Sequence, residues 1–313
     1  MIKDHPYGDD IKAQLKAAAL DRLHRFVLSG GTVRGAVLHG TRMVNEMRAN
    51  HGLGILETLV LGHAYLAGGL MTSHLKGNDR IRLAVDCTGP IKGLTVEVNA
   101  FGEVRGHLKS VPIAVDKPLE SFNLSPFFGA GVLEVTRFLE DAKNPFTGRV
   151  ALMYGSLAKD LAYYFLTSEQ IPSAFHLSIK FDTEGTVTGA GGLFLQVLPG
   201  APEDTVASLE SLVAGISSIG EAFESGIPAE TVIADAFRGH DAKILDSYRV
   251  EFFCHCGLEK IRNMLAMLPE DDLRDIRENG PFPVDIQCHH CSSHYQFSQA
   301  DVVTIYNSRY SPN

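Results

Sequence analysis

Four cysteines near the C-terminal end of this 313-residue chain restrict its possible folds more than any other feature. They form two short pairs, CHC at 254–256 and CHHC at 288–291, separated by 31 residues. Two close pairs with such a spacer can bring four sulfur atoms to one tetrahedral zinc ion, and four thiolates leave no open position for a catalytic water. The spacing therefore predicts one Zn²⁺ per chain in a closed, non-hydrolytic site. The predicted ligands are Cys254, Cys256, Cys288 and Cys291.

Such a site has two interpretations. The spacing alone favours a purely structural zinc module. The alternative is a thiol switch, because zinc keeps cysteines as thiolates and thiolates react with oxidants. Oxidation to disulfides would release the metal together with its folding free energy, about 10–16 kcal/mol in zinc-binding peptides. The acidic segment before the site favours the switch, since short helices carrying like charges are marginally stable and can unfold with the module.

Other metal-binding or redox-capable side chains change this prediction little. His255, His289 and His290 lie between the paired cysteines and could each replace a sulfur, but four cysteines already satisfy zinc. These imidazoles could instead tune access to the site or its sensitivity to acid. Cys87 stands alone in a predicted strand, where we expect a buried structural thiol. The residues expected to pack inside the cysteine module are His294, Tyr295 and Phe297.

The distribution of charge argues against nucleic acid as a partner. The net charge is −9, and residues 200–253 hold 10 acidic against 3 basic side chains. No segment has the basic excess that phosphate binding requires. Residues 59–71 form the most apolar stretch, which is too short to span a bilayer, so we expect a buried helix and no membrane partner.

The expected compartment follows from the N-terminus and the cysteines. Residues 1–10 are polar and acidic, with no apolar segment behind a basic start, so no secretory signal is predicted. Five cysteines in a chain without such a signal indicate a reducing compartment. We therefore expect a cytoplasmic protein.

Hydrophobic periodicity predicts an α+β fold with a mostly antiparallel sheet and packed helices. A meander of strands is expected over residues 80–108, where apolar residues alternate and short turns separate the segments. Helices grouped together rather than alternating with strands argue against a parallel sheet. Gly189, Gly191 and Gly192 are interpreted as turn or bulge glycines. Helices are predicted over 11–28, 41–50, 55–75 and 156–168, and further strands over 32–38, 131–137, 148–154, 174–182 and 190–198.

A Pro- and Gly-rich break at 198–202 divides the chain. We expect an α+β domain over residues 1–199, an acidic helical linker over 200–250 and a small zinc-binding module over 251–313. The linker is predicted to form helices at 203–226 and 229–237, and the module a helix at 258–268.

No catalytic arrangement is recognisable in the sequence. It contains neither a Gly-x-Ser-x-Gly element nor a phosphate-binding glycine loop with the required spacing. Remaining histidines and carboxylates are scattered, so we expect a binding protein rather than an enzyme.

The chain resembles the redox-regulated 33 kDa heat-shock chaperone family (33 kDa chaperonin). The C-terminal Cys-x-Cys and Cys-x-x-Cys pairs, about thirty residues apart, carry the resemblance. Further matching segments, in the same order as in the family, are DRLHRF at 21–26, VRG at 33–35, SEQIP at 168–172 and AGGLFLQVLP at 190–199. The residues before Asp21 form an N-terminal extension that we expect to be dispensable.

The resemblance implies a mechanism for a stress-response chaperone. Reduced thiolates at the four positions bind zinc, and the module holds the linker folded. Oxidation then joins near neighbours into disulfides, zinc is released, and module and linker unfold. Exposed apolar surface binds unfolding client proteins without ATP, and the oxidised chain dimerises. The implied disulfides are Cys254 with Cys256 and Cys288 with Cys291.

The client-binding surface is expected at residues 203–237 and the sheet face that they cover. A thiol oxidoreductase is an alternative function, but it needs a cysteine pair outside a closed metal site. An unrelated enzyme or adaptor with a structural zinc ribbon is the other alternative.

Overall fold

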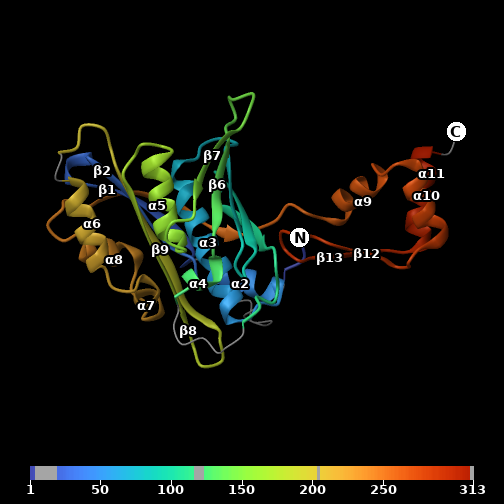
Figure 1. The fold of residues 1–313 in the computed structure, drawn as a ribbon, viewed down its shortest axis with the longest axis horizontal. Helices are drawn as coiled ribbons and strands as arrows, with labels where there is room; N and C mark the ends of the chain where they lie inside the picture. The colour runs from blue at the N-terminus through green and yellow to red at the C-terminus, as the bar shows by residue number, and fades with distance from the viewer. Residues whose placement is uncertain (4–19, 116–122, 203–204, 311–313) are drawn as a thin grey trace.

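The computed structural model describes residues 1–3, 20–115, 123–202 and 205–310. Two large sheets with their helices form a main body, residues 20–253, from which a smaller cysteine module, residues 254–310, projects (Figure 1). The expected α+β class with mostly antiparallel sheets is confirmed.

The first sheet of the main body has five antiparallel strands in the order β10-β1-β2-β9-β8. The second sheet has the order β11-β5-β4-β3-β6-β7 and is antiparallel except for the β11–β5 pair. The strands of the first sheet are β1 (Arg22–Leu28), β2 (Val33–His39), β8 (Ser173–Phe181), β9 (Val187–Val197) and β10 (Lys243–Arg249). Those of the second are β3 (Arg80–Cys87), β4 (Gly93–Asn99), β5 (Glu103–Leu108), β6 (Gly131–Phe138), β7 (Phe146–Ala151) and β11 (Glu251–Phe252).

Helix α3 (Ile55–Met71) forms the centre of the core, because it contacts strands of both sheets. With the following 3₁₀ turn η2 (Thr72–His74) it is long and apolar enough to cross a membrane, yet 89% of its most apolar window is buried inside the protein. A helix that is apolar on all sides is suited to such a core position, as the sequence predicted. Of the other helices, α2 (Thr41–His51) and α5 (Leu157–Thr167) contact α3, and the remaining short elements of the main body are η1 (Ser29–Gly31) and α4 (Ser125–Phe128).

Three linker helices cover the outer face of the first sheet: α6 (Thr205–Gly215), α7 (Ile219–Glu224) and α8 (Ala229–Ala236). The predicted helix at 203–226 is therefore divided in two, and residues 203–204 lie outside the described part. A second apolar core fills the space between the linker helices and the sheet. Its largest members are Phe26, Leu28, Leu193, Leu195, Phe223, Ile233 and Phe237.

The three β9 glycines lie inside the strand and not in a turn, and Gly189 adjoins a shift in the β8–β9 register, so the bulge interpretation holds at that glycine. A Cβ at Gly189 would lie 2.0 Å from the carbonyl oxygen of Gly220, and one at Gly191 would lie 2.3 Å from the ring of Phe223. Glycine is needed here because α7 packs directly on the strand backbone.

The predicted helix over 11–28 is wrong where the structure describes it, because residues 22–28 form strand β1. The apolar spacing of RLHRFVL fits either structure, and pairing with β2 and β10 selects the strand. The ring of Phe26 lies across Gly35, its partner on β2, and contacts Phe237 of the linker. Residues 11–19 lie outside the described part. The end of the predicted helical linker also differs, since 243–249 form β10.

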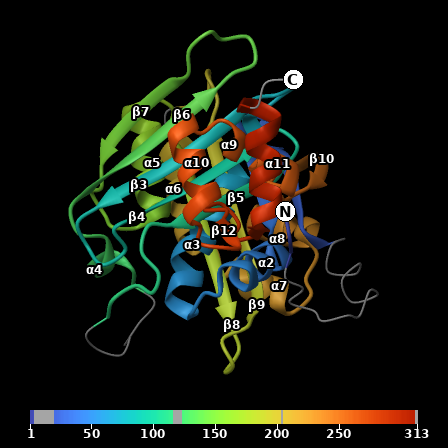
Figure 2. The same cartoon turned by 90° about the vertical axis from the view of Figure 1, so that its right-hand side faces the viewer.

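The cysteine module is built from one short hairpin and three helices. Figure 2, which turns the module towards the viewer, shows α10 and α11 side by side. Buried Leu273, Val302 and Ile305 form their common core with Phe297. The elements are α9 (Leu258–Ala266), α10 (Glu270–Asn279), β12 (Val284–Gln287), β13 (His294–Phe297) and α11 (Gln299–Tyr310).

Candidate metal centre

Strand β11 joins the first cysteine pair to the main body. The backbone N–H of Glu251 donates to the carbonyl of Gly102 at 2.9 Å, and that of Phe253 donates to Val104 at 3.0 Å. Cys254 follows immediately, so the second sheet fixes the position of the first pair.

The second pair lies in the turn between β12 and β13. The N–H of Ser292 donates to the carbonyl of Cys288 at 2.7 Å, and the N–H of Cys288 donates to the carbonyl of Ser293 at 2.9 Å. Ser292 has a positive φ of 52° that closes this turn. The N–H of Gly106 on β5 donates to the carbonyl of His290 at 3.3 Å, so the turn also contacts the main body.

These two anchors bring all four cysteine sulfur atoms within 4.8 Å of one another. Sγ of Cys254 lies 3.9 Å from Sγ of Cys288, and Sγ of Cys256 lies 3.2 Å from Sγ of Cys291. The sulfur atoms are not bonded to each other. In a tetrahedral zinc–thiolate site with bonds of about 2.3 Å the sulfurs are about 3.8 Å apart. The group could therefore hold a metal ion, and its soft donor set suits zinc.

Hydrogen bonds between the sulfur atoms favour a thiolate at Cys254, and a negative charge within the cluster favours binding of a cation. The pKa of Cys254 is lowered far below its ordinary value because Cys288 and Cys291 act as donors to it. Its thiolate in turn raises the pKa of Cys288 to about 11. A positive ion at the centre would replace these protons, since metal binding requires deprotonated sulfur.

Polar groups around the sulfur atoms complete the site. Nη1 of Arg105 on β5 lies 3.7 Å from Sγ of Cys254 and supplies a positive charge beside it. The hydroxyl of Tyr295 lies 3.2 Å from Sγ of Cys256, and burial raises its pKa, so it remains a donor. The hydroxyl of Ser293 lies 3.2 Å from Sγ of Cys291. Such outer partners orient the ligands of metal sites.

The three histidines between the cysteines do not join the group of donor atoms found among the described residues. His255 is exposed, and its Nε2 lies 2.6 Å from a carboxylate oxygen of Glu103. The ring of His290 packs against that of His107 on β5 at 5.5 Å. His289 lies 5.9 Å from the same ring.

Two single residues, Cys87 and His294, are more exposed than the sequence predicted. Cys87 is half-buried at the end of β3 and does not belong to the cluster, although burial does raise its pKa. Tyr295 and Phe297 are buried as expected, but His294 is exposed and contacts Asp285 at 3.0 Å.

Sequence reasoning missed the part of the main body that faces the cluster. Asn50 of α2 donates from Nδ2 to the carbonyl of Cys291 at 3.0 Å, and Nδ1 of His51 lies 2.8 Å from the hydroxyl of Ser292. The site therefore lies at the junction of main body and module. No spacing in the sequence links these residues to the cysteines, because Arg105 and Cys254 are 149 positions apart and Asn50 and Cys291 are 241 apart.

Access to the thiols bears on the oxidoreductase alternative. Three of the four cysteine side chains are nearly inaccessible: Cys254 is 1% exposed, Cys256 9% and Cys291 0%. Disulfide exchange requires an approaching thiolate to reach a sulfur atom directly. The geometry therefore favours a metal site over a disulfide-exchange site.

The fold and the site together define a two-sheet α+β protein with a four-cysteine module at its edge. The family model described as "Hsp33 protein" matches residues 21–298, which is most of the chain. The chain belongs to the Hsp33 family.

Curated relatives and a solved structure agree with this assignment. The chain is 35% identical over 287 residues to the 33 kDa chaperonin of Desulforamulus reducens, covering 91% of this chain and 97% of the relative. It is 33% identical over 289 residues to that of Ruminiclostridium cellulolyticum, with 91% and 97% covered. The crystal structure of the 33 kDa chaperonin (heat shock protein 33 homolog) of Thermotoga maritima matches with a TM-score of 0.83 at 29% identity, covering 94% of this chain and 100% of that one. The relatives are named chaperonins, not enzymes.

Proposed function

We propose that this protein is a redox-regulated, ATP-independent holdase chaperone. In the reduced state one Zn²⁺ would be held by Cys254, Cys256, Cys288 and Cys291. Oxidation of these thiols to disulfides would release the zinc and activate binding of unfolding proteins. The observation that carries the proposal is the position of the four thiols, which connect the cysteine module to the main body.

Zinc would supply cross-linking and no reaction chemistry at this site. The four thiolates fill a tetrahedral coordination sphere, so no position remains for a substrate. Without the metal, the hairpin carrying Cys288 and Cys291 would be held to the described part of the main body by hydrogen bonds with Gly106, Asn50 and His51. A module of this size depends on its metal for much of its stability.

The redox step needs an oxidant such as hydrogen peroxide. Two thiols and one peroxide give one disulfide and two water molecules, so two peroxides are needed for two disulfides. The family resemblance implies pairs Cys254–Cys256 and Cys288–Cys291. In the reduced structure the sulfur atoms of Cys256 and Cys291 lie 3.2 Å apart, so peptide mapping of the oxidised chain must test the pairing.

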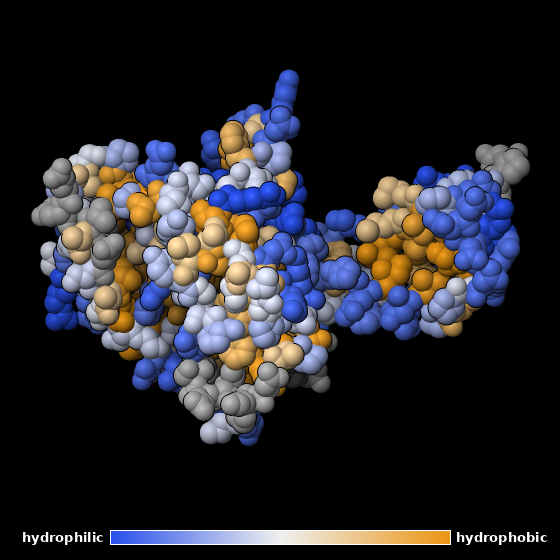
Figure 3. Space-filling view, viewed as in Figure 1, coloured by the Kyte–Doolittle hydropathy of each residue, from blue (hydrophilic) through white to orange (hydrophobic). Residues whose placement is uncertain are grey.

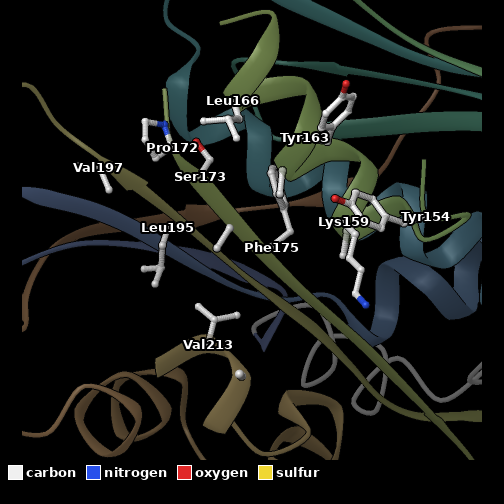
Figure 4. A pocket seen from close by; sticks show the side chains of 14 residues that line it. Tyr154, Lys159, Tyr163, Leu166, Pro172, Ser173, Phe175, Leu195, Val197 and Val213 are labelled. Atoms are coloured by element: carbon white, nitrogen blue, oxygen red, sulfur yellow. The ribbon is translucent and has the colours of Figure 1, made fainter. Parts of the chain in front are cut away.

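The linker helices provide the surface that activation would expose. They cover an apolar sheet face that includes Leu28, Leu193 and Leu195. Beside α6, an apolar cavity of about 530 Å³ already opens between α5, β8 and β9, where Val213 lies across from Leu195 and Phe175 (Figure 4). We propose residues 205–237 and this sheet face as the binding surface for apolar segments of client proteins.

The cysteine module also carries exposed apolar side chains. Figure 3 shows an apolar area on the module, and Leu258, Met264 and Met267 are 49%, 54% and 66% exposed. Apolar patches of this kind suit contact with other proteins. We propose homodimerisation of the oxidised chain and a cytoplasmic location, without nucleic acid or membrane partners.

Light scattering of an aggregating client protein tests the proposal. The chain would be added zinc-loaded and reduced, or after peroxide treatment, with zinc release followed in parallel by a chromogenic chelator. We expect only the oxidised, zinc-free form to suppress scattering in the absence of ATP. Zinc that stays bound under peroxide, or two equally inactive forms, would contradict the redox switch. Cys87→Ser, which leaves the cluster intact, serves as the control and is expected to behave like the wild type.

A further inference from the structure

Residues 1–3 lie directly on the four-cysteine site, although the family match begins only at residue 21. Figure 1 places the N-terminus beside β13, where the module meets the main body. The N–H of Cys254 donates to the thioether sulfur of Met1 at 3.1 Å, and the Met1 nitrogen donates to the carbonyl of Cys256 at 2.7 Å. Met1 thus holds the backbone of the first cysteine pair.

The next residue holds the second pair and helix α2. The N–H of Ile2 donates to the hydroxyl of Ser293 at 3.0 Å, and the Ile2 carbonyl lies 2.9 Å from the same hydroxyl. The amide of Asn50 on α2 donates to the Ile2 carbonyl at 2.8 Å. Because Ser293 also contacts the sulfur of Cys291, Ile2 lies one hydrogen bond away from the cluster.

Lys3 forms an ion pair with the main body. Its Nζ lies 3.0 Å from a carboxylate oxygen of Glu46 on α2 and 3.8 Å from Glu251 on β11. The Lys3 side chain is only 19% exposed and that of Glu46 only 4%, so solvent screens this pair less than a surface pair. The ammonium also lies 6.0 Å from the ring centres of Phe252 and Phe253, which lead into Cys254.

We propose that residues 1–3 form an N-terminal strap that clamps both cysteine pairs to α2 and β11, so this part of the extension is not dispensable as the sequence led us to expect. The side chains that contact the strap are those of Glu46, Asn50, Glu251 and Ser293. The strap adds non-covalent contacts between the main body and the cysteine module at the junction where the four thiols lie. Without the strap, the module should separate from the main body more often. An effect of the strap on the oxidation threshold rests on the proposed function, whereas an effect of the strap on the opening of the junction does not.

Hydrogen–deuterium exchange of the reduced, zinc-loaded full chain tests the strap without oxidant or client. Lys3→Glu places a carboxylate beside Glu46 and Glu251. We expect peptides containing Cys254–Cys256 and Cys288–Cys291 to exchange about fivefold faster, which corresponds to about 1 kcal/mol. Lys3→Ala should give a smaller increase, and Lys3→Arg should restore the wild-type rate.

The matched control is Lys243→Glu, which makes the same charge change at an exposed lysine that pairs with Asp241. The proposal is overturned if Lys3→Glu and Lys243→Glu exchange alike at the cysteine peptides. The proposal is also overturned if Lys3→Glu raises the exchange rate of β3 and β6 as much as that of the cysteine peptides, because such a result indicates general destabilisation. A second measurement, zinc release under peroxide, is expected to be faster in Lys3→Glu than in Lys243→Glu. If no form of the wild type suppresses client aggregation, the switch proposal fails, while the exchange result still decides the strap.

Discussion

Single residues at the cysteine site show how a local motif depends on distant partners. Cys254 is buried because β11 carries it against β5, and Cys291 is buried because its turn rests on α2. Arg105 and Tyr295 then surround the sulfur atoms with donors. Cys254 and Cys291 thus each have a non-covalent partner that lies far from the motif in the sequence.

Replacing one cysteine should remove the metal. We expect Cys291→Ser to lower zinc affinity by more than the about 10- to 100-fold produced by losing an outer hydrogen-bond partner. A hydroxyl is a poorer zinc ligand than a thiolate, and the remaining three sulfurs leave the site open. Elemental analysis of the purified protein should find close to no zinc in this variant and one equivalent in Cys87→Ser. One retained equivalent in Cys291→Ser would show that this cysteine is not a ligand.

His74, a partly buried histidine with a buried Nε2 atom, should make stability depend on pH. The ring of His74 packs against Phe194 at 4.9 Å, and its buried Nε2 has no hydrogen-bond partner among the described residues. Burial, together with the charges of Arg34 and Arg137, lowers the pKa of His74 to about 3. The unfolded chain, with a histidine pKa near 6.5, therefore takes up a proton below that pH that the folded chain does not. The stability from neutral His74 is present above pH 6.5 and is lost as the pH falls towards 3.

The variant His74→Phe keeps an aromatic ring and removes this proton uptake. Between pH 7.5 and pH 5, the wild type should lose about 2 kcal/mol more unfolding free energy than the variant. Urea unfolding at the two pH values measures the difference. Equal losses in both proteins would mean that His74 does not stay neutral in the folded state.

At the scale of elements, the contact of α7 with β9 determines how well the apolar sheet face is covered. The short helix can approach because Gly189 and Gly191 carry no side chains. Ser218 caps its start, where the hydroxyl accepts from the N–H of Glu221 at 3.2 Å. Helix α7 is therefore held on the sheet by close backbone packing, by the apolar core around Phe223 and by hydrogen bonds of Ser178 with Ser218 and Gly220.

A methyl group in this contact should displace α7. Gly189→Ala is expected to destabilise the protein by about 1–3 kcal/mol through overpacking, because the new Cβ meets the Gly220 carbonyl at 2.0 Å. Binding of an apolar fluorescent dye to the reduced protein should rise, and some client suppression should appear without oxidation. The control is Gly215→Ala at the end of α6, where no atom lies within 4 Å of the added methyl group and no loss is expected. Dye binding equal to the wild type would contradict the role given to this contact.

At the scale of the whole molecule, the chain is a large body and a small module that meet at the four thiols (Figure 1). The linker runs from β9 over the first sheet, returns as β10 beside β1, and continues as β11 into the second sheet. Strand β11 therefore connects the linker, which precedes it, directly to the first cysteine pair.

Removal of zinc under reducing conditions should lower the hydrogen-exchange protection of the module and the linker but not that of the main sheets. We expect a strong chelator to abolish exchange protection in residues 254–310 and to lower it in 205–252, while β3–β6 and β8–β9 stay protected. Hydrogen exchange before and after chelation provides the measurement, and it tests the expected divisions at 199 and 250. Uniform loss of protection over the whole chain would mean that body and module unfold as one unit.

Sequence alone determined the features that depend on neighbouring residues. The two cysteine pairs could be identified because zinc ligands follow short spacings, and α3 and the meander of β3 to β5 could be predicted because their periodicity is local. Residues 22–28 could not be assigned to a strand from their own spacing, because it fits a helix equally well and the strand is selected by pairing with β2 and with β10, which lies more than two hundred positions away. Only the tertiary structure decided that Gly189 lies under α7 and that Met1, Ile2 and Lys3 contact the cysteine site. These features arise from contacts between distant segments, and such contacts leave no periodic or spacing signal in a single sequence.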